Sequence, residues 1–567
     1  MERVWLKHYP AGIPPEVDLD EFSSLASVLQ DSCRRFAALP AFSSMGAQIT
    51  YAELDRESRA FAAWLQQSLA LRKGDRVAIM MPNLLQYPVA MFGALRAGLV
   101  VVNVNPQYTV TELEHQLLDS GAAAIVVLEN FAQTLQQVLQ RNPALKLAVV
   151  TTEVGDMFPV FKEVLTNAVV KYVKKLVPPW SIPGAVEFNA ALRAGHALNL
   201  QDVPLGHPDT AFLQYTGGTT GVAKGAMLTH GNMVANLQQL SAWIAPNLLE
   251  GKEIFVCPLP LYHVFALSSS LVFMKIGALT VLVANPRDMP AFIHDLKKFP
   301  FTAIIGVNTL YRALLDAPGF AEVDMRSLKM ANAGGMAVQR VVAERWKAAT
   351  GIPLVEAYGL TETSPGAIAN PLDIEEWTGM IGMPIPSTQA TILDDNDKAL
   401  GPNEVGEICL RGPQVMAGYW NLPDETALAF TPDGWLRTGD MGFMDERGWF
   451  KITDRKKDMI VVSGFKVFPN QIEDVVAMHP GVAEVAAIGV ADAHSGEVVK
   501  IVVVRSDANL TAQALLDHCR QHLTGYKMPR FVEFSEEPLP KSNIGKILRR
   551  QVREASACAA NEGGMAA

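Results

Sequence analysis

The sequence contains few cysteines, and they are not arranged as a metal site or a disulfide framework. The five cysteines among 567 residues are scattered and form no CxxC or HxxC spacing. Such usage favours reduced thiols and a cytoplasmic protein. An excess of positive charge is also absent, because 48 lysines and arginines against 58 aspartates and glutamates give a net charge of −10. Broad binding to nucleic acid or to anionic lipid is therefore not expected.

Long hydrophobic runs are missing as well. The first residues, MERVWLKH, contain no apolar core of the signal-peptide type. Residues 254–284 have only His263 and Lys275 as ionisable side chains, but two prolines interrupt the start of this stretch. Its uninterrupted part, Val264–Met274, is shorter than the roughly 20 residues that cross a bilayer. We predict a buried helix followed by a buried strand.

Local motifs of several enzyme classes are absent too. The sequence contains no G-x-S-x-G hydrolase motif, no H-E-x-x-H zinc motif and no G-x-G-x-x-G dinucleotide loop. What it does contain is a globular balance of 49% hydrophobic and 19% charged residues. At this length the chain is expected to fold as about three to four domains.

Apolar runs of strand length alternate with helical patterns through the first part of the chain. Because these runs are continuously apolar, they indicate a parallel α/β sheet. The predicted strands are residues 76–81, 100–102, 123–128, 211–215, 254–257, 279–283 and 302–306.

The pattern changes near residue 388. Short strands separated by Gly, Asn and Asp predict an antiparallel, β-rich subdomain over about 388–453, which completes an N-terminal domain of residues 1–453. The charge run at 454–458, DRKKD, is typical of a surface linker and is predicted to be a hinge. Residues 459–567 predict a small α+β domain, with a disordered Ala/Gly-rich tail from about 555.

The strongest local motif is a loop rich in glycine and threonine, TGGTTGVAKG at 216–225, after an apolar strand. Glycine lets the backbone approach a ligand closely, and successive N–H groups form a nest for phosphate. Lys224 adds a cation, although the loop lacks the Walker A spacing. The alternative is a flexible surface turn.

Four further segments have functional side chains at strand ends or turns. They are NAGG at 332–335, YGLTET at 358–363, DGWLRTGD at 433–440 and PKSNIGK at 540–546. The carboxylate of Glu362 suits Mg²⁺ held together with phosphate, and Asp440 suits the hydroxyls of a ribose. Arg455 can reach a phosphate with its planar guanidinium. Taken alone, the glycine turn and Lys546 are more often structural or solvated features.

Taken together, these segments resemble the adenylate-forming (acyl-activating) enzymes over about residues 25–553. Within that family the chain is most similar to bacterial long-chain fatty-acyl-CoA synthetases, on the strength of the segment 433–476. The resemblance implies a large N-terminal domain of α/β sheets with a small β-subdomain, followed by a small mobile C-terminal domain. Many relatives have Ser or Pro at the positions of Gly217 and Ala223, and Thr at that of Ser542.

The resemblance also implies two half-reactions. A fatty acid attacks ATP to give acyl-adenylate and pyrophosphate, and coenzyme A then takes the acyl group and releases AMP. The implied catalytic residues are Lys546, Glu362, Thr361 and His263, with Glu362 and Thr216 at Mg²⁺ and Lys457 as the pivot of a domain rotation. Coenzyme A would meet Gly464, Phe465 and Lys466. The implied ATP-binding residues are Thr216, Gly217, Gly218, Thr219, Thr220, Gly221, Lys224, Gly334, Gly335, Tyr358, Thr361, Asp440 and Arg455.

The expected function is thus an ATP-dependent long-chain fatty-acyl-CoA ligase serving β-oxidation or lipid synthesis. Alternatives are a ligase for a medium-chain or aryl acid, one that loads a carrier protein, or a non-catalytic acyl-CoA or nucleotide sensor on the same fold. His263 has a structural alternative as a buried histidine. A fatty acid partitions into bilayers, so peripheral contact with the inner face of a membrane stays open, although no basic amphipathic helix indicates it. A homodimer is compatible with the sequence.

Overall fold

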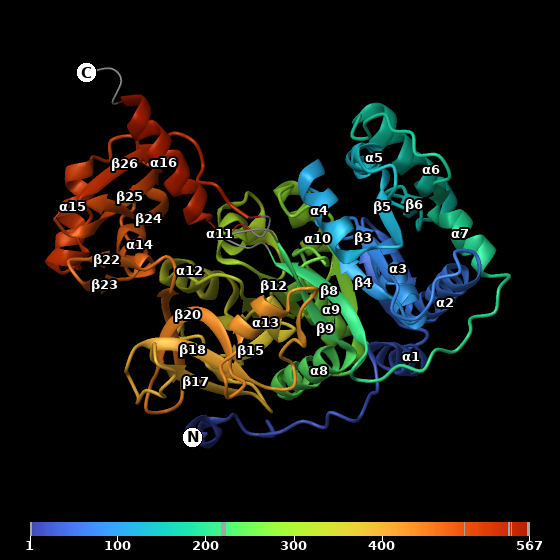
Figure 1. The fold of residues 1–567 in the computed structure, drawn as a ribbon, viewed down its shortest axis with the longest axis horizontal. Coiled ribbons are helices and arrows are strands. Elements are labelled where there is room, and N and C mark those ends of the chain that lie inside the picture. Colours follow the sequence, from blue (N-terminus) through green and yellow to red (C-terminus); the bar gives the residue numbers. More distant parts are fainter. Residues whose placement is uncertain (1–2, 217–222, 493, 543–544, 546, 564–567) are drawn as a thin grey trace.

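The computed structural model describes residues 3–216, 223–492, 494–542, 545 and 547–563. Figure 1 shows a large N-terminal domain and a small C-terminal domain, coloured orange to red, at one side of it. The strands of the two domains form four sheets. The prediction of this fold class is confirmed.

The first sheet has eight strands in the order β19-β9-β8-β4-β3-β5-β6-β7, and its centre is parallel. Alternate side chains of β3 pack into different apolar cores, Val77 and Ile79 into one and Ala78 and Met80 into the other. Burial on both faces explains why these strands are continuously apolar. The strands are β3 (Arg76–Met80), β4 (Val100–Asn103), β5 (Ala124–Leu128), β6 (Ala148–Thr152), β7 (Val186–Glu187), β8 (Thr210–Thr216), β9 (Lys224–Thr229) and β19 (Gly418–Tyr419).

The second sheet has nine strands in the order β16-β15-β14-β13-β12-β10-β11-β1-β2. The sequence predicted that the runs from 254 onward would continue the first sheet, and this was wrong. Local periodicity defines a strand but not its neighbour, so it does not separate two similar sheets. The strands are β1 (Pro40–Ser44), β2 (Ala47–Thr50), β10 (Ile254–Cys257), β11 (Leu279–Leu282), β12 (Ala303–Gly306), β13 (Met330–Ala333), β14 (Leu354–Gly359), β15 (Gly366–Ala369) and β16 (Met383–Pro384).

One apolar core contains residues from both large sheets and from the helices α2 (Tyr51–Gln67), α3 (Gln86–Arg96), α8 (His230–Ile244) and α9 (Val264–Lys275). Helix α9 is apolar on nearly all sides, as expected of a helix enclosed by other elements. The predicted buried helix and strand within 254–284 are therefore confirmed as α9 and β11. Within the described residues, no helix combines the length and the apolar character needed to cross a bilayer.

The β-rich segment predicted from about residue 388 forms an antiparallel sheet of four strands. They are β17 (Gln389–Leu393), β18 (Gly406–Arg411), β20 (Leu436–Met444) and β21 (Phe450–Arg455). The C-terminal domain has a five-stranded sheet with three helices. Its elements are β22 (Ile460–Val462), β23 (Phe465–Val467), α14 (Pro469–Ala477), β24 (Val482–Asp492), β25 (Gly496–Arg505), α15 (Ala512–Arg520), β26 (Phe531–Ser535) and α16 (Arg549–Gly563).

The last helix, α16, spans Arg549–Gly563. The predicted disorder of the tail from about 555 stays a prediction. Alanine has the highest intrinsic helix propensity, so the alanines of this segment extend a helix that begins in an ordered domain.

Candidate active site

A cavity of about 1690 Å³ lies where the carboxyl ends of strands from both large sheets face the β-subdomain and the C-terminal domain. Crevices beyond the carboxyl ends of parallel strands are the usual ligand sites of α/β sheets. The lining includes the ends of β8, β13 and β14, parts of β20 and β21, the segment 453–458 and the loop before α16. Most of the residues predicted from the sequence lie around this space.

The two ends of the glycine-rich loop are close together at the cavity wall. Thr216 ends β8 and pairs in register with Lys224, which begins β9. Lys224 Nζ forms an ion pair with Glu425 and lies 5.3 Å from the centre of the Tyr419 ring. The predicted phosphate-binding residues between them, Gly217, Gly218, Thr219, Thr220 and Gly221, lie outside the described residues.

Glu362 is fixed by a side chain that the sequence analysis missed. It sits in a 3₁₀ turn, Thr361–Thr363, just after β14, and its Oε1 accepts a hydrogen bond from Tyr419 Oη at 2.7 Å. Tyr419 belongs to the two-residue strand β19, so no periodicity in the sequence marks it. Among the described residues, no donor contacts the second carboxylate oxygen of Glu362.

Tyr358, Asp440 and Arg455 form a connected polar group beside this turn. Tyr358 Oη donates to Asp440 Oδ2 at 2.6 Å, and Arg455 Nε lies 2.7 Å from Asp440 Oδ1. Asp440 on β20 and Arg455 on β21 are direct partners in an antiparallel pair, so backbone pairing alone brings the charges together. Burial, and then the charge of Asp440, raises the pKa of the Tyr358 hydroxyl well above its usual value. The phenol therefore stays neutral.

The turn at Gly334 and Gly335 is tight at both glycines. Gly335 has φ of +76°, in the left-handed region that side chains disfavour. A Cβ atom on Gly334 would lie 3.0 Å from Cε1 of Phe265, at the start of α9. The two predicted residues thus bring backbone close to α9 at the cavity wall.

His263 lines the cavity and also begins α9. Its Nδ1 accepts a hydrogen bond from the backbone N–H of Phe265 at 3.3 Å. Burial lowers the pKa of His263 to about 4, so the imidazole is neutral near pH 7 with its proton on Nε2. Both interpretations of this residue, a structural histidine and one that faces the substrate, are compatible with the geometry.

A buried ion cluster joins the segment 454–458 to the C-terminal domain. Arg549 at the start of α16 contacts Asp454 at 3.1 Å, Asp458 at 3.4 Å and Glu473 at 2.6 Å. The backbone N–H of Asn470 also donates to Asp454 Oδ2 at 2.6 Å. Arg549 directly follows the predicted lysine loop, but the sequence analysis did not single it out.

The last loop reaches the N-terminal domain. Lys546 lies outside the described residues. Its neighbour Gly545 has φ of +82°, and a Cβ atom there would lie 2.5 Å from Oγ1 of Thr309 in α11 (Asn308–Asp316). Lys541, Ser542 and Ile547 line the cavity, as does the predicted pivot, Lys457.

The predicted coenzyme A segment is not among the residues that line the cavity. Gly464 lies in the turn between β22 and β23 with φ of +84°. The Phe465 ring stacks on Tyr526 with centres 4.8 Å apart, and Lys466 Nζ lies 3.9 Å from Asp395 of the β-subdomain. In this domain arrangement Lys541, Ser542 and Ile547 face the cavity and the turn at Gly464 does not.

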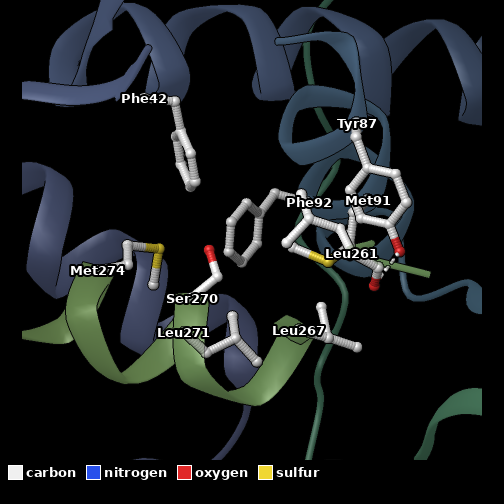
Figure 2. A pocket seen from close by; sticks show the side chains of 9 residues that line it. All are labelled: Phe42, Tyr87, Met91, Phe92, Leu261, Leu267, Ser270, Leu271 and Met274. Carbon is white, nitrogen blue, oxygen red and sulfur yellow. Dashed lines mark hydrogen bonds between the residues drawn. The ribbon is translucent and has the colours of Figure 1, made fainter. Parts of the chain in front are cut away.

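A second cavity, of about 10 Å³, lies beside α9 (Figure 2). Apolar side chains of α3 and α9 line it together with Phe42 and Leu261, and Tyr87 Oη donates to Leu261 O at 3.0 Å. A space of this size holds about one water molecule. It is too small for a substrate.

Known proteins match this chain in sequence or in fold over nearly its whole length. The long-chain-fatty-acid–CoA ligase of Escherichia coli O157:H7 is 55% identical over 555 residues, 98% of each chain. The protein of the same name from Haemophilus influenzae is 49% identical over 558 residues, again 98% of each. The crystal structure of the anthranilate CoA ligase AuaEII with anthranoyl-AMP has the same fold, with a TM-score of 0.84 at 23% identity over 96% of this chain and 100% of that one.

Family models match both domains. Residues 29–420 match the AMP-binding enzyme family, and residues 471–546 match the C-terminal domain of AMP-binding enzymes. The first match covers more than half of the chain and contains the glycine-rich loop, the turn at Gly334 and the segment around Glu362. The chain therefore belongs to the family of AMP-binding enzymes.

Proposed function

We propose that this chain is an ATP-dependent ligase that activates a long-chain fatty acid as acyl-adenylate and transfers the acyl group to coenzyme A. One observation carries the proposal: a single cavity has the Lys224, Glu362 and Asp440 groups in its wall and apolar side chains of α8 and α9 in another part of the same wall. A nucleotide fits the first part and a hydrocarbon chain the second. The relatives named as long-chain-fatty-acid–CoA ligases support this choice of substrate.

In the first half-reaction a carboxylate oxygen attacks the α-phosphorus of ATP, and the bond between the α- and β-phosphates breaks to release pyrophosphate. The reactants are anions, so catalysis consists mainly of positioning and charge neutralisation. We assign the β- and γ-phosphates to the loop from Thr216 to Lys224, and the α-phosphate to Thr361. Lys546 would bridge the carboxylate and the α-phosphate as charge develops.

The nucleoside would lie along the strand ends. Asp440 is 2% exposed and is fixed by Tyr358 and Arg455, so its carboxylate is oriented for the two ribose hydroxyls. Gly334 and Gly335 line the cavity together with Tyr358 and would face the adenine.

The residues near Glu362 fit a magnesium ion. Within the described part of the chain, Tyr419 holds its carboxylate through one oxygen only, and carboxylate and hydroxyl oxygens are the donors that Mg²⁺ prefers. Glu362 and the hydroxyl of Thr216 would hold the ion together with phosphate oxygens. A bound Mg²⁺ would supply charge neutralisation on those oxygens.

In the second half-reaction the thiolate of coenzyme A attacks the acyl carbonyl and AMP leaves. The turn at Gly464, Phe465 and Lys466 is outside the cavity, so its proposed contact with coenzyme A requires the C-terminal domain to rotate about Lys457. The boundaries 1–453, 454–458 and 459–567 are proposed on the same grounds. The arrangement described here, with Lys541, Ser542 and Ile547 at the cavity, suits the first half-reaction.

The acyl chain would lie between α8, α9 and the nine-stranded sheet. The apolar wall there comprises Leu240, Ile244, Val272, Phe273, Ile305 and Met330. Ser269 is the small residue on this face of α9, one helical turn after Phe265. His263 would stand where the chain meets the carboxylate.

Exchange of labelled pyrophosphate into ATP, measured across straight-chain acids from C6 to C18 and an aryl acid, tests the proposal. We expect the highest kcat/KM with the long chains, and a loss of at least ~10²-fold in Lys546→Ala. Ser269→Phe should lower kcat/KM for C16 and C18 far more than for C6, because a larger side chain shortens the space for the chain. Highest activity with the aryl acid would support that alternative, and no exchange with any acid would support the sensor.

A further inference from the structure

Buried polar side chains hold the stretch that joins β10 to α9, residues 257–263, which we call the β10–α9 segment. They are Asn83, Tyr87, Asn103 and Gln214, each at most 5% exposed. Asn83 Oδ1 accepts a hydrogen bond from the backbone N–H of Leu261 at 2.8 Å. Its Nδ2 donates to the carbonyl of Leu259 at 2.8 Å and to that of Cys257 at 3.1 Å. A buried amide with three such partners fixes the backbone that it binds.

A chain of hydrogen bonds runs from α3 to the end of the same segment. Tyr87 Oη lies 2.5 Å from Asn103 Oδ1 and 3.0 Å from the carbonyl oxygen of Leu261, and Figure 2 shows the second of these contacts. Asn103 Nδ2 donates to Gln214 Oε1 at 2.9 Å, and Gln214 Nε2 donates to the carbonyl of Tyr262 at 2.7 Å. Buried polar chains of this kind stabilise one specific arrangement.

This chain of bonds connects the two large sheets. The β10–α9 segment follows a strand of the nine-stranded sheet, whereas Asn103 on β4 and Gln214 on β8 belong to the eight-stranded sheet. Gln214 and Thr216 are two residues apart on β8, so their side chains lie on the same face of the strand. Both line the large cavity, and the glycine-rich loop follows directly after them. The network therefore fixes the β10–α9 segment relative to the start of that loop.

The end of the segment carries the histidine of the cavity wall. The bond from Gln214 holds the peptide group between Tyr262 and His263. The backbone N–H of His263 donates to the carbonyl of Pro260 at 2.9 Å, and its Nδ1 accepts from the N–H of Phe265. Backbone and ring of His263 are thus both fixed at the cavity.

From this arrangement we infer that Tyr87, Asn103 and Gln214 are positioning residues that set the place of His263 relative to the phosphate-binding loop. The inference deepens the proposed function and rests on it, because that function places the acyl carboxylate at His263 and the phosphates at the loop. A carboxylate reacts with the α-phosphate only within narrow limits of distance and direction, and a misplacement of about 1 Å can cost ~10²-fold in rate.

Tyr87→Phe tests the inference, because Tyr87 is not among the described residues that line the large cavity. The substitution removes one hydroxyl and keeps the ring. In pyrophosphate exchange with a C16 acid, kcat/KM for the acid should fall by ~10-fold, since the carboxylate is held less well. The KM for ATP should change by less than about two-fold, because other side chains hold the nucleotide.

The matched control is Tyr51→Phe. Tyr51 is also fully buried, and its hydroxyl contacts the carbonyls of Met274 and Ala278, none of which is among the described residues of the cavity wall. Both variants lose one buried hydroxyl, so their unfolding midpoints should fall by similar amounts. Only Tyr87→Phe should change the kinetics of the acid. Equal effects of the two variants on kcat/KM for the acid would overturn the inference.

A double-mutant cycle tests whether the network acts through His263. Gln214→Met should lower kcat/KM for the acid by ~10-fold or more in the unmodified chain. In His263→Asn it should have less than about two-fold further effect, because the residue to be positioned is gone. Asparagine is a favoured N-cap, so α9 keeps its start. Equal losses in both backgrounds would show that Gln214 does not act through His263.

A binding measurement separates this inference from the proposed function. If the unmodified chain exchanges pyrophosphate with no acid, the proposed ligase activity is wrong. The Kd for cis-parinaric acid, a fluorescent C18 fatty acid, then compares the variants in the presence of ATP. Tyr87→Phe should weaken this binding by ~5-fold and Tyr51→Phe should not, because only the first loosens the wall at His263. In an inactive chain, equal Kd values for both variants and the unmodified protein would overturn the inference.

Discussion

At the scale of single residues, the placement of the polar groups follows from which strands pair. Asp440 and Arg455 meet because they are opposite each other in β20 and β21. Glycine turns and polar residues at strand ends can be predicted from the sequence, because local chemistry defines them. The side chains that hold these groups in place cannot be predicted in this way, because they are distant in the sequence. Glu425, which pairs with Lys224, is 201 positions away, and Tyr419 is 57 positions from Glu362. Only the folded chain shows these contacts.

The charge of Glu362 gives a first test at this scale. Glu362→Gln keeps the size of the side chain but removes the negative charge proposed to hold Mg²⁺. The adenylation rate should fall by at least ~10²-fold, and a higher Mg²⁺ concentration should restore part of it. Pyrophosphate exchange against Mg²⁺ concentration measures both effects.

Tyr419→Phe is the matched variant, because it removes only the hydroxyl that donates to Glu362 Oε1. Since the carboxylate keeps its charge, the loss should be smaller, about 10-fold, and confined to low Mg²⁺. A rate of Glu362→Gln equal to that of the unmodified chain at limiting Mg²⁺ would show that Glu362 is not at the metal.

His263 predicts a dependence of stability on pH. Burial lowers its pKa from 6.5 to about 4, so the unfolded chain binds a proton at this site before the folded chain does as the pH falls. The stability that the neutral histidine contributes is therefore complete above pH 6.5 and is lost as the pH falls toward 4, by up to about 3 kcal/mol.

The measurement is urea unfolding of the unmodified chain and of His263→Gln at several pH values from 7 down to 4. Glutamine does not titrate, so the difference in unfolding free energy between the two chains should shrink as the pH falls. His230, whose pKa is also lowered to about 4 by burial, is present in both chains and cancels in the difference. A difference that stays constant with pH would contradict the buried, neutral state of His263.

At the scale of elements, regular and strongly apolar segments were predicted well. Strands such as β5 and β10 and the helix α9 are buried nearly throughout, so their composition alone identifies them. The division into two sheets was missed because a buried parallel strand looks the same in either sheet.

The ion cluster around Arg549 links three elements and allows a prediction. Arg549→Ala would leave Asp454 and Glu473 without their cation, and Asp454 is fully buried. Removing one partner of a buried ion pair costs about 3–5 kcal/mol. Because Asp454 begins the proposed hinge, we expect the C-terminal domain to loosen at this end, with faster proteolysis around 454–470 and a lower unfolding midpoint.

Arg550→Ala is the control, because Arg550 is exposed and its ion pair with Glu554 is of the surface type. Such pairs contribute about 0–1 kcal/mol, so this variant should unfold and be cleaved like the unmodified chain. Arg549→Lys should lie between the two, since a lysine keeps the charge but cannot reach all three carboxylates with a planar fork. Equal rates of proteolysis for Arg549→Ala and Arg550→Ala would show that the ion cluster does not hold the proposed hinge to the C-terminal domain.

At the scale of the whole molecule, the two half-reactions make different demands on the position of the C-terminal domain. Among the described residues, polar contacts join the two domains: Arg312 of α11 donates to the carbonyl of Ala483 at 2.6 Å, and Lys466 Nζ lies 3.9 Å from Asp395. Polar contacts of this kind are readily exchanged, so the molecule can adopt a second arrangement if the proposed hinge allows it.

Lys457→Pro tests whether the proposed hinge allows this second arrangement of the domains. Among the described residues the Lys457 N–H has no hydrogen-bond partner, so the substitution removes no bond seen in this arrangement. Proline fixes φ at Lys457 and disfavours the helical region at the residue before it, which restricts the backbone change that a rotation requires. Pyrophosphate exchange should stay within a few-fold of the unmodified rate, whereas thioester formation from supplied acyl-AMP and coenzyme A should fall by at least ~10²-fold. Arg312→Ala should have the opposite effect and slow adenylation more than thioester formation. It removes a contact of the arrangement in which Lys541, Ser542 and Ile547 line the cavity. If Lys457→Pro slowed both half-reactions equally, the pivot would have to lie elsewhere. Restriction at the true pivot should not slow adenylation, because the present arrangement of the domains suits that step.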